Sequence, residues 1–224
     1  MSAASIIETA TGVLLDFDGP VCSIFANLPA PGVAEDLRQV LRGDGVAINT
    51  ELANEPDPME VLRYAARFSS DVLVHVDNAL RAAELKAATT AEPTPGAADV
   101  MRHVCKYGIP LVIVSNNSAP AIRRYLDDHD LTRYVRGVVG RSFGRPDLMK
   151  PDPSPLIRGI EFIGSRTGGC VVIGDSVADI VAARTAHVAS IGFANRPEKV
   201  RALSQTGADA IITDMSQLVG GAHD

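Results

Sequence analysis

The chain has 224 residues, of which 46% are apolar and 21% are charged, and its net charge is −6. This apolar content is enough for one full-sized hydrophobic core, or for one core with a modest insertion. The mean hydropathy of +0.11 argues against a disordered chain. The excess of acids argues against a broad basic surface for nucleic acid or anionic lipid.

The sequence predicts a cytoplasmic protein. An apolar run such as Leu111–Val114 is too short to cross a bilayer, so we expect no contact with a membrane. No Lys, Arg or His precedes Arg38, and the positive segment typical of a signal peptide is therefore missing. The cysteines are three and widely spaced, which favours reduced thiols over a disulfide framework: Cys22, Cys105 and Cys170.

Short runs of Val, Ile and Leu alternate with helical stretches, which predicts an α/β fold with a parallel sheet. The runs are almost continuously apolar, as expected where helices cover both faces of a sheet. We predict strands at 12–17, 110–115, 135–140, 170–174, 189–193 and 210–213. We predict helices between them, near 96–107, 119–129, 154–164, 176–187, 197–206 and 215–219.

Residues 21–92 interrupt this alternation and are predicted to be helical. Asp57 followed by Pro58 is typical of a helix start. The apolar residues from Val72 onward recur with the period of a helix, although 72–76 also fits a strand. A helix near 34–42 is expected to end at the glycines that follow it, and the turn-rich segment 92–96 closes the insert. The insert carries more acids than bases.

Four groups of polar residues fall at the ends of predicted strands, the edge where open parallel sheets bind ligands. The first is Asp16-Phe17-Asp18-Gly19. Side chains alternate along a strand, so Asp16 and Asp18 leave it pointing the same way. Two carboxylates this close repel each other unless a cation or a shared proton lies between them. The pattern favours a functional pair over two acids in a solvated loop.

The other three groups are individually weaker. Ser115 and Asn116 follow an apolar strand and suit an anionic oxygen, although such residues are more often a turn and a helix cap. Lys150 is one of four lysines in the chain and precedes a proline-rich helix start. Asp175 ends a strand and Asp179 follows four residues later, where helix capping explains one acid more easily than two.

Taken in order, DxDG, Ser after an apolar strand, Lys-Pro and GDxxxD resemble the four motifs of the haloacid dehalogenase-like (HAD) superfamily. The resemblance covers about residues 11–193. The insert is similar to the helical cap of the phosphoglycolate phosphatase and β-phosphoglucomutase branch. The resemblance implies a Rossmann-like, three-layer α/β core at residues 1–20 and 93–224, with a small α-helical cap domain at 21–92.

The resemblance also implies a Mg²⁺-dependent phosphatase that hydrolyses a phosphate monoester through an aspartyl-phosphate. Asp16 would be the nucleophile, and Asp18 would give and take the proton. Mg²⁺ would be held by Asp16, the backbone carbonyl of Asp18, and Asp175. The expected partner is a small phosphorylated metabolite, and the protein is expected to be a monomer or a homodimer.

The remaining motif residues would handle the phosphoryl group. Ser115 and the Asn116 amide would hold its oxygens, and Lys150 would neutralise the charge that develops on them. Asp179 would orient Lys150 or a metal-bound water.

Two positions depart from the family pattern. Pro20 stands where relatives more often carry Thr, Ser or Val, so a backbone donor is missing near the entry to the insert. Gly174 stands where mutase relatives carry an acid that adds a metal ligand, which favours hydrolysis over isomerisation.

The sequence leaves alternatives open. A phosphosugar mutase would need cationic residues of the insert in the site, whereas we expect these residues on a solvated helix face: Arg38, Arg42, Arg63, Arg67, Arg81, Lys86 and His75. Phosphonate cleavage would need a Schiff-base lysine, for which Lys86 is a poor candidate. The retained Asp18 argues against dehalogenation. A phosphate-binding protein without turnover remains an alternative from a different class. In an enzyme, the insert is expected to close over the site during the reaction.

Overall fold

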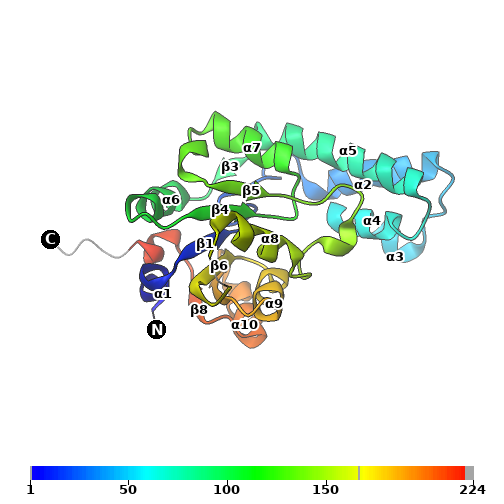
Figure 1. The fold of residues 1–224 in the computed structure, drawn as a ribbon. Coiled ribbons are helices and arrows are strands. Elements are labelled where there is room, and N and C mark those ends of the chain that lie inside the picture. The colour runs from blue at the N-terminus through cyan, green and yellow to red at the C-terminus, as the bar shows by residue number, and fades with distance from the viewer. Residues whose placement is uncertain (1, 166, 220–224) are drawn as a thin grey trace.

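The computed structural model describes residues 2–165 and 167–219 (Figure 1). Its centre is a six-stranded parallel sheet in the order β5-β4-β1-β6-β7-β8. All six predicted strands are confirmed, each within a few residues of its expected ends. The strands are β1 (Gly12–Leu15), β4 (Leu111–Val114), β5 (Gly137–Val139), β6 (Cys170–Gly174), β7 (Ala189–Phe193) and β8 (Ala210–Ile212).

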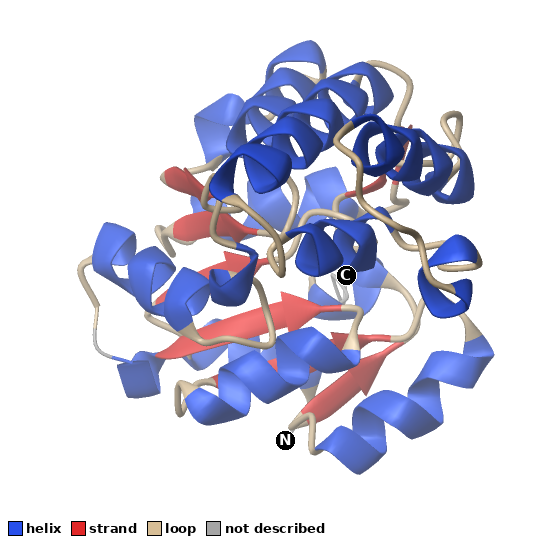
Figure 2. Cartoon of the chain, turned by 90° about the vertical axis from the view of Figure 1, so that its right-hand side faces the viewer, coloured by secondary structure: helices blue, strands red, loops and turns tan. Residues whose placement is uncertain are grey.

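Helices cover both faces of this sheet (Figure 2). Val13 and Leu15 of β1 face one core, and Leu14 faces the other, which is the alternation of a strand buried on both sides. The first core is covered by α1 (Ala3–Thr9), α6 (Ala97–Lys106) and α7 (Ala119–Asp128). The second is covered by α8 (Ser154–Ile163) and α9 (Val177–Thr185), with α10 (Pro197–Thr206) packed beside α9. The expected three-layer, Rossmann-like α/β fold is therefore confirmed.

The helical insert, residues 21–92, contributes a further layer beyond the ends of the strands (Figure 1). Its helices are α2 (Ala30–Gly43), α3 (Thr50–Ala53), α4 (Pro58–Ala65) and α5 (Ser70–Ala88). They share a separate hydrophobic cluster, to which Met149 of the α/β core also contributes. Asp57 caps α4 by accepting a hydrogen bond from the Met59 N–H, as its sequence predicts. The ambiguous segment 72–76 lies within α5 and is helical.

A short antiparallel ribbon joins the insert to the core. Its strands are β2 (Cys22–Ser23) and β3 (Glu92–Pro93), so the two places where the chain passes between core and insert are paired with each other. Thr94 reinforces the pairing, because its hydroxyl donates to the Gly19 carbonyl at 2.5 Å. The helix α5, which precedes β3 in the chain, packs alongside α7 of the core (Figure 1).

Several short elements were not expected from the sequence. The helix α1 begins at Ser2, whose hydroxyl caps it, and its residues Ile6 and Ile7 are buried under the sheet. The last predicted helix, 215–219, is a short 3₁₀ helix at Met215–Leu218, and three others occur at Thr132–Tyr134, Pro146–Leu148 and Thr167–Gly169. Helices of so few residues depend on tertiary packing rather than on a periodic pattern.

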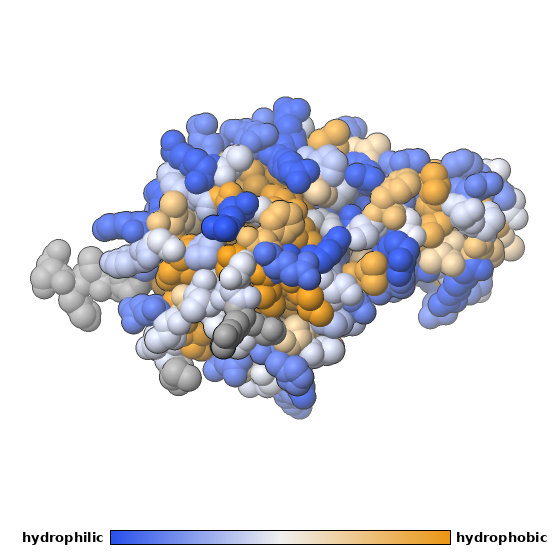
Figure 3. Space-filling view, viewed as in Figure 1, coloured by the Kyte–Doolittle hydropathy of each residue, from blue (hydrophilic) through white to orange (hydrophobic). Residues whose placement is uncertain are grey.

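Apolar residues also reach the surface. Figure 3 shows them gathered on the central part of the face that Figure 1 presents, and Ile157 and Phe162 of α8 are among the exposed apolar side chains. None of the helices in residues 2–165 and 167–219 has both the length and the apolar composition to cross a bilayer.

Candidate active site

All the residues that the motifs singled out lie around the carboxyl ends of the central strands. All of them except Asp179 border a cavity of about 870 Å³ between the sheet edge and the insert. The core contributes Asp16, Asp18, Ser115, Asn116, Lys150 and Asp175 to its lining. The insert contributes Phe25, Pro31, Met59, Glu60 and Arg63, among others. Asp179 lies behind this lining and is fully buried.

Lys150 lies between two carboxylates. Its Nζ is 2.8 Å from Oδ1 of Asp16 and 2.5 Å from Oδ1 of Asp179, and it also donates to the Val114 carbonyl at 3.1 Å. The other oxygen of Asp179 accepts hydrogen bonds from the backbone and hydroxyl of Ser176, which begins α9. Asp179 is therefore both a helix cap and the partner that fixes the Lys150 ammonium.

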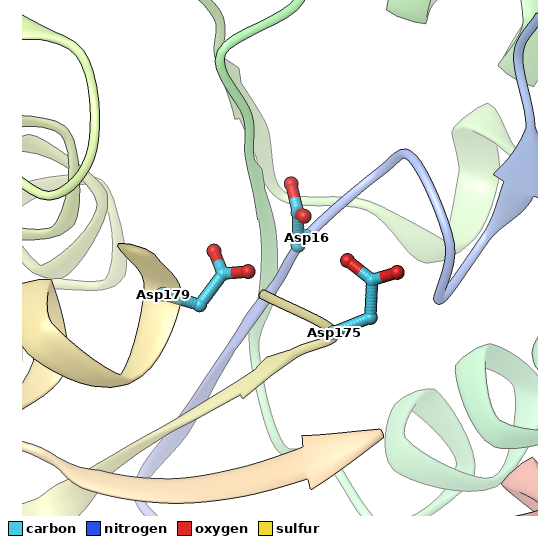
Figure 4. A group of neighbouring side chains, drawn as sticks. All are labelled: Asp16, Asp175 and Asp179. Atoms are coloured by element: carbon cyan, nitrogen blue, oxygen red, sulfur yellow. The ribbon is translucent and has the colours of Figure 1, made fainter. Parts of the chain in front are cut away.

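Asp16 and Asp175 carry the oxygens that best fit a divalent cation. Ligand atoms of Asp16, Asp175 and Asp179 all lie within 4.8 Å of one another, and Figure 4 shows the three carboxylates around a common space. Mg²⁺ prefers such hard oxygen ligands. Because Lys150 and Ser176 already occupy the oxygens of Asp179, the better fit is Asp16 with Asp175.

Gly19 makes the close approach to Asp175 possible. Its φ is +100°, and a Cβ built on it would lie 2.4 Å from the Asp175 carboxylate. A side chain there would be strained and would also collide with the candidate metal ligand. The glycine of the DxDG motif is thus required by this geometry.

Asp175 has a cationic neighbour that the sequence analysis missed. The Nζ of Lys199, near the start of α10, forms a short hydrogen bond to Oδ2 of Asp175. The sequence did carry a signal for this lysine. It follows the end of β7, and the same edge of the sheet carries the other site residues.

Burial raises the pKa of the acids in this site. For Asp16 the cause is desolvation, reinforced by the charge of Asp179 and opposed by Lys150. Desolvation raises the pKa of Asp18 to about 6, although its carboxylate accepts a hydrogen bond from the Ile24 N–H. Desolvation also raises the pKa of Asp175, against the lowering effect of Lys199. Burial thus disfavours the ionised form of all three acids, which a cation bound between them would favour.

The loop after β4 is tied to the segment that carries Lys150. The Asn116 side chain accepts from the Lys150 N–H at 2.8 Å and donates to the Lys150 carbonyl at 3.1 Å. The Ser115 hydroxyl donates to Asn117 Oδ1 and accepts from the Asn117 N–H. Since the Asn116 side-chain amide has this structural use, its backbone N–H is the group that fits an anionic oxygen.

Two of the basic residues expected on a solvated face of the insert are not there. Arg38 is buried and donates to the Glu55 carbonyl at 2.6 Å, which holds the chain after α3. Arg63 donates to the carbonyls of Lys150, at 2.8 Å, and of Pro146, at 3.2 Å. The expectation is wrong for both, because each guanidinium finds buried backbone acceptors that only the folded chain brings near.

Gly174 has no room for a side chain. A Cβ built on it would lie 2.4 Å from the Asp179 side chain. An acid at this position, as in the mutase pattern, would therefore displace Asp179 from its bond with Lys150.

Comparison with known proteins finds phosphoglycolate phosphatases among the chain's relatives. A phosphoglycolate phosphatase from Pseudomonas putida is 25% identical over 231 residues, which cover 95% of this chain and 79% of that protein. One from Photorhabdus laumondii is 23% identical over 227 residues, with 97% and 94% covered. With one from Pseudomonas fluorescens, 25% identical over 130 residues, the match covers 58% of this chain and about half of the relative, 47%.

Solved structures share the fold. A hydrolase from Pseudomonas syringae has a TM-score of 0.69 and 17% identity, with 94% of this chain and 96% of that chain covered. A phosphonoacetaldehyde hydrolase-like protein from Oleispira antarctica has a TM-score of 0.71 and 14% identity, with 94% and 90% covered. A sequence profile described as haloacid dehalogenase-like hydrolase matches residues 10–187. The resemblance inferred from the four motifs is thus confirmed, and the chain belongs to the haloacid dehalogenase-like hydrolase family.

Proposed function

We propose that the protein is a Mg²⁺-dependent phosphatase that hydrolyses a phosphate monoester of a small metabolite through an aspartyl-phosphate on Asp16. One observation carries the proposal: the Asp16 carboxylate lies 2.8 Å from the Lys150 ammonium at the head of a cavity that Asp18, Ser115 and Asp175 also line. The phosphoglycolate phosphatases among its relatives support the same reaction class.

Asp16 is the proposed nucleophile. An oxygen of its carboxylate attacks phosphorus, the bond from phosphorus to the ester oxygen breaks, and Asp18 gives its proton to the leaving alkoxide. In the second step Asp18 takes a proton from a water that attacks phosphorus, and the bond to Asp16 breaks. Phosphate leaves and both carboxyl groups return to their first state. The partial burial of Asp18 suits this proton exchange, because it raises the pKa of the carboxyl group to about 6, closer to neutral pH than that of an exposed aspartate.

The groups around the phosphoryl oxygens are assigned from their positions. The Asn116 backbone N–H would donate to these oxygens, the Ser115 hydroxyl would do so by turning its one proton away from Asn117 Oδ1, and Lys150 would balance their charge. Asp179 holds Lys150 in place. Asp16, Asp175 and the backbone carbonyl of Asp18 would hold Mg²⁺, which when bound offsets the repulsion between the acids and the substrate.

The helical insert is proposed to act as a cap domain, with residues 21–92 as its extent. Its side chains Met59, Glu60 and Arg63 line the cavity, and the leaving group of a substrate would lie against them. We propose that this part of the insert selects the metabolite.

Two competing activities each lack a residue that they need. Lys86, the candidate Schiff-base lysine, is exposed and borders a separate cavity with Leu28 and Val33. Arg63 of the insert lines the cavity, as a mutase would need, but Gly174 leaves no space for the additional acid of the mutase pattern.

Phosphate release from a panel of metabolite monoesters, with Mg²⁺ and with a chelator, tests the proposal. We expect turnover that needs the metal, and a loss of at least about 1000-fold in Asp16→Asn. Lys106→Met, a change on α6, serves as the control. Full turnover in Asp16→Asn, or no release from any monoester by the wild type, would contradict the proposed function.

A further inference from the structure

Behind the phosphate-binding loop lies a second group of buried charges that no motif includes. The side chains of Asp77 and Glu84 are fully buried, and Arg141 is 1% exposed between them. Asp77 and Glu84 belong to α5 of the insert, whereas Arg141 follows β5 of the core. The group therefore joins the insert to the core in the interior of the protein.

Each carboxylate holds a different loop of the core. Glu84 accepts hydrogen bonds from the Ser118 N–H, at 3.0 Å, and from the Asn117 side-chain amide, at 3.4 Å. Asp77 accepts from the Gly144 N–H at 2.7 Å. The first loop begins with Ser115, and the second leads to Lys150. Both loops that carry the proposed phosphate-binding groups are thus attached to one helix.

Arg141 links the two carboxylates to each other and to the first loop. Its guanidinium lies 2.6 Å from Glu84 and 2.9 Å from Asp77. It also donates to the Asn116 carbonyl at 2.8 Å, and its backbone N–H donates to the Asn117 carbonyl at 2.9 Å. The planar fork of arginine can make these bonds together, which a lysine cannot.

The spacing of the two acids on α5 explains how one helix serves both loops. Residues seven apart in a helix are two turns apart on the same face. Asp77 and Glu84 share this face with Leu80, which packs into the core of the insert. Gly140 lets the loops approach, because a Cβ there would lie 2.4 Å from the Ala119 backbone nitrogen.

We propose that Glu84, Asp77 and Arg141 are positioning residues: they fix the backbone of the Ser115–Ser118 loop and the path to Lys150, and so set the geometry of the phosphate site. This inference rests on the proposed function of that site. It also means that α5 cannot swing away from the core as a rigid lid without breaking both carboxylate contacts.

Glu84→Gln is the test variant, since it keeps the size of the side chain and removes its charge. We expect the affinity of the Mg²⁺-loaded protein for inorganic phosphate to fall about tenfold, and kcat/KM for p-nitrophenyl phosphate to fall about 10- to 100-fold. We also expect faster hydrogen exchange in the peptide that contains Ser118. Arg141→Lys keeps the positive charge but loses the planar guanidinium, and it should shift each readout in the same direction. It replaces Glu84→Gln as the test variant if Glu84→Gln does not fold.

Arg38→Met is the matched control. It removes a buried arginine of the insert that contacts neither loop, so it should lower the Tm and leave phosphate affinity and exchange at Ser118 unchanged. The proposal is overturned if Glu84→Gln binds phosphate and exchanges like the wild type, or if Arg38→Met weakens phosphate binding equally. A wild type that neither binds phosphate nor cleaves p-nitrophenyl phosphate would sink the proposed function instead, and exchange at Ser118 would still decide whether Glu84 holds the loop.

Discussion

The carboxylates around Lys150 and those around Arg141 are both buried, yet their oxygens meet different partners. Asp77 and Glu84 accept hydrogen bonds from Arg141 and from backbone N–H groups of two loops. Asp16 and Asp175 have lysine partners but also face an open cavity. The carboxylate oxygens of the first group have their hydrogen-bond partners within the protein. The carboxylates of the second group keep oxygens on the cavity side that a cation can bind.

This difference separates a structural use of buried acids from a functional one. Burying a carboxylate costs free energy unless charged and hydrogen-bonding partners offset the cost. Around Arg141 the offset comes from the chain itself. Around Asp16 the offset would come from Mg²⁺. Without the metal the buried acids lower the stability of the protein, which is a frequent property of active sites.

The largest expected effect on stability is at Arg141. Its replacement by Met leaves two buried carboxylates without their cation, so we expect the free energy of unfolding to fall by about 3–5 kcal/mol. Urea unfolding measures this change. Arg145→Met is the control, because Arg145 pairs with Asp147 on the surface and its loss should leave stability unchanged. Equal effects of the two substitutions would show that the buried group has no special structural importance.

The next effect is a dependence of stability on pH in the metal-free protein. Asp18 has a pKa of about 6 in the folded state, above its ordinary value of 3.8. The folded protein then holds this proton more tightly than the unfolded chain does. The contribution of Asp18 to stability is therefore fully present below about pH 4 and is lost as the pH rises through 6, by up to about 3 kcal/mol. Asp16, whose pKa is also raised, extends the loss to higher pH.

Thermal unfolding in chelator between pH 4 and 8 checks this dependence. Asp18→Asn should flatten the profile around pH 6, and saturating Mg²⁺ should restore stability at pH 8. A metal-free wild type that becomes more stable between pH 5 and 8 would show that burial does not raise the pKa values of these acids in the folded state.

Asp175→Asn should have a smaller effect, opposite in sign to that of Arg141→Met. It removes one of the crowded acids, so we expect the metal-free protein to gain about 1 kcal/mol at pH 8, roughly 3 °C in Tm. The same variant should lose the stabilisation by Mg²⁺, which for the wild type is about 2.7 kcal/mol when the metal is at about 100 times its Kd. Differential scanning calorimetry with and without Mg²⁺ measures both. Unchanged stabilisation by Mg²⁺ would remove Asp175 from the metal site.

The smallest effect is expected at Lys199. Its ammonium holds one oxygen of Asp175 and repels a second cation, so Lys199→Met should tighten Mg²⁺ binding about threefold to tenfold. Calorimetric titration of the metal-free protein measures the affinity. Arg201→Met, an exposed position on the same helix, is the control. Weaker binding in Lys199→Met would instead make Lys199 a residue that orients Asp175 for the metal.

The strands of the core and the motif residues at their ends were predictable from the sequence. A strand such as β6 is an unbroken apolar run that ends in Gly-Asp, and this local signal needs no knowledge of the rest of the chain. The group around Arg141 was not predicted. Its one signal was the position of Asp77 and Glu84 beside Leu80, on the helix face whose apolar residues were expected to be buried.

The sequence by itself determined the parallel sheet, the helical nature of the insert and the four motifs that mark the family. Only the tertiary structure decided which charges would meet: Lys199 with Asp175, Arg63 with the Lys150 carbonyl, and Arg141 with two acids of α5. The physical reason is the range of the interactions. Strands, helices and caps follow from neighbours along the chain, whereas an ion pair depends on two side chains that packing brings together from distant segments.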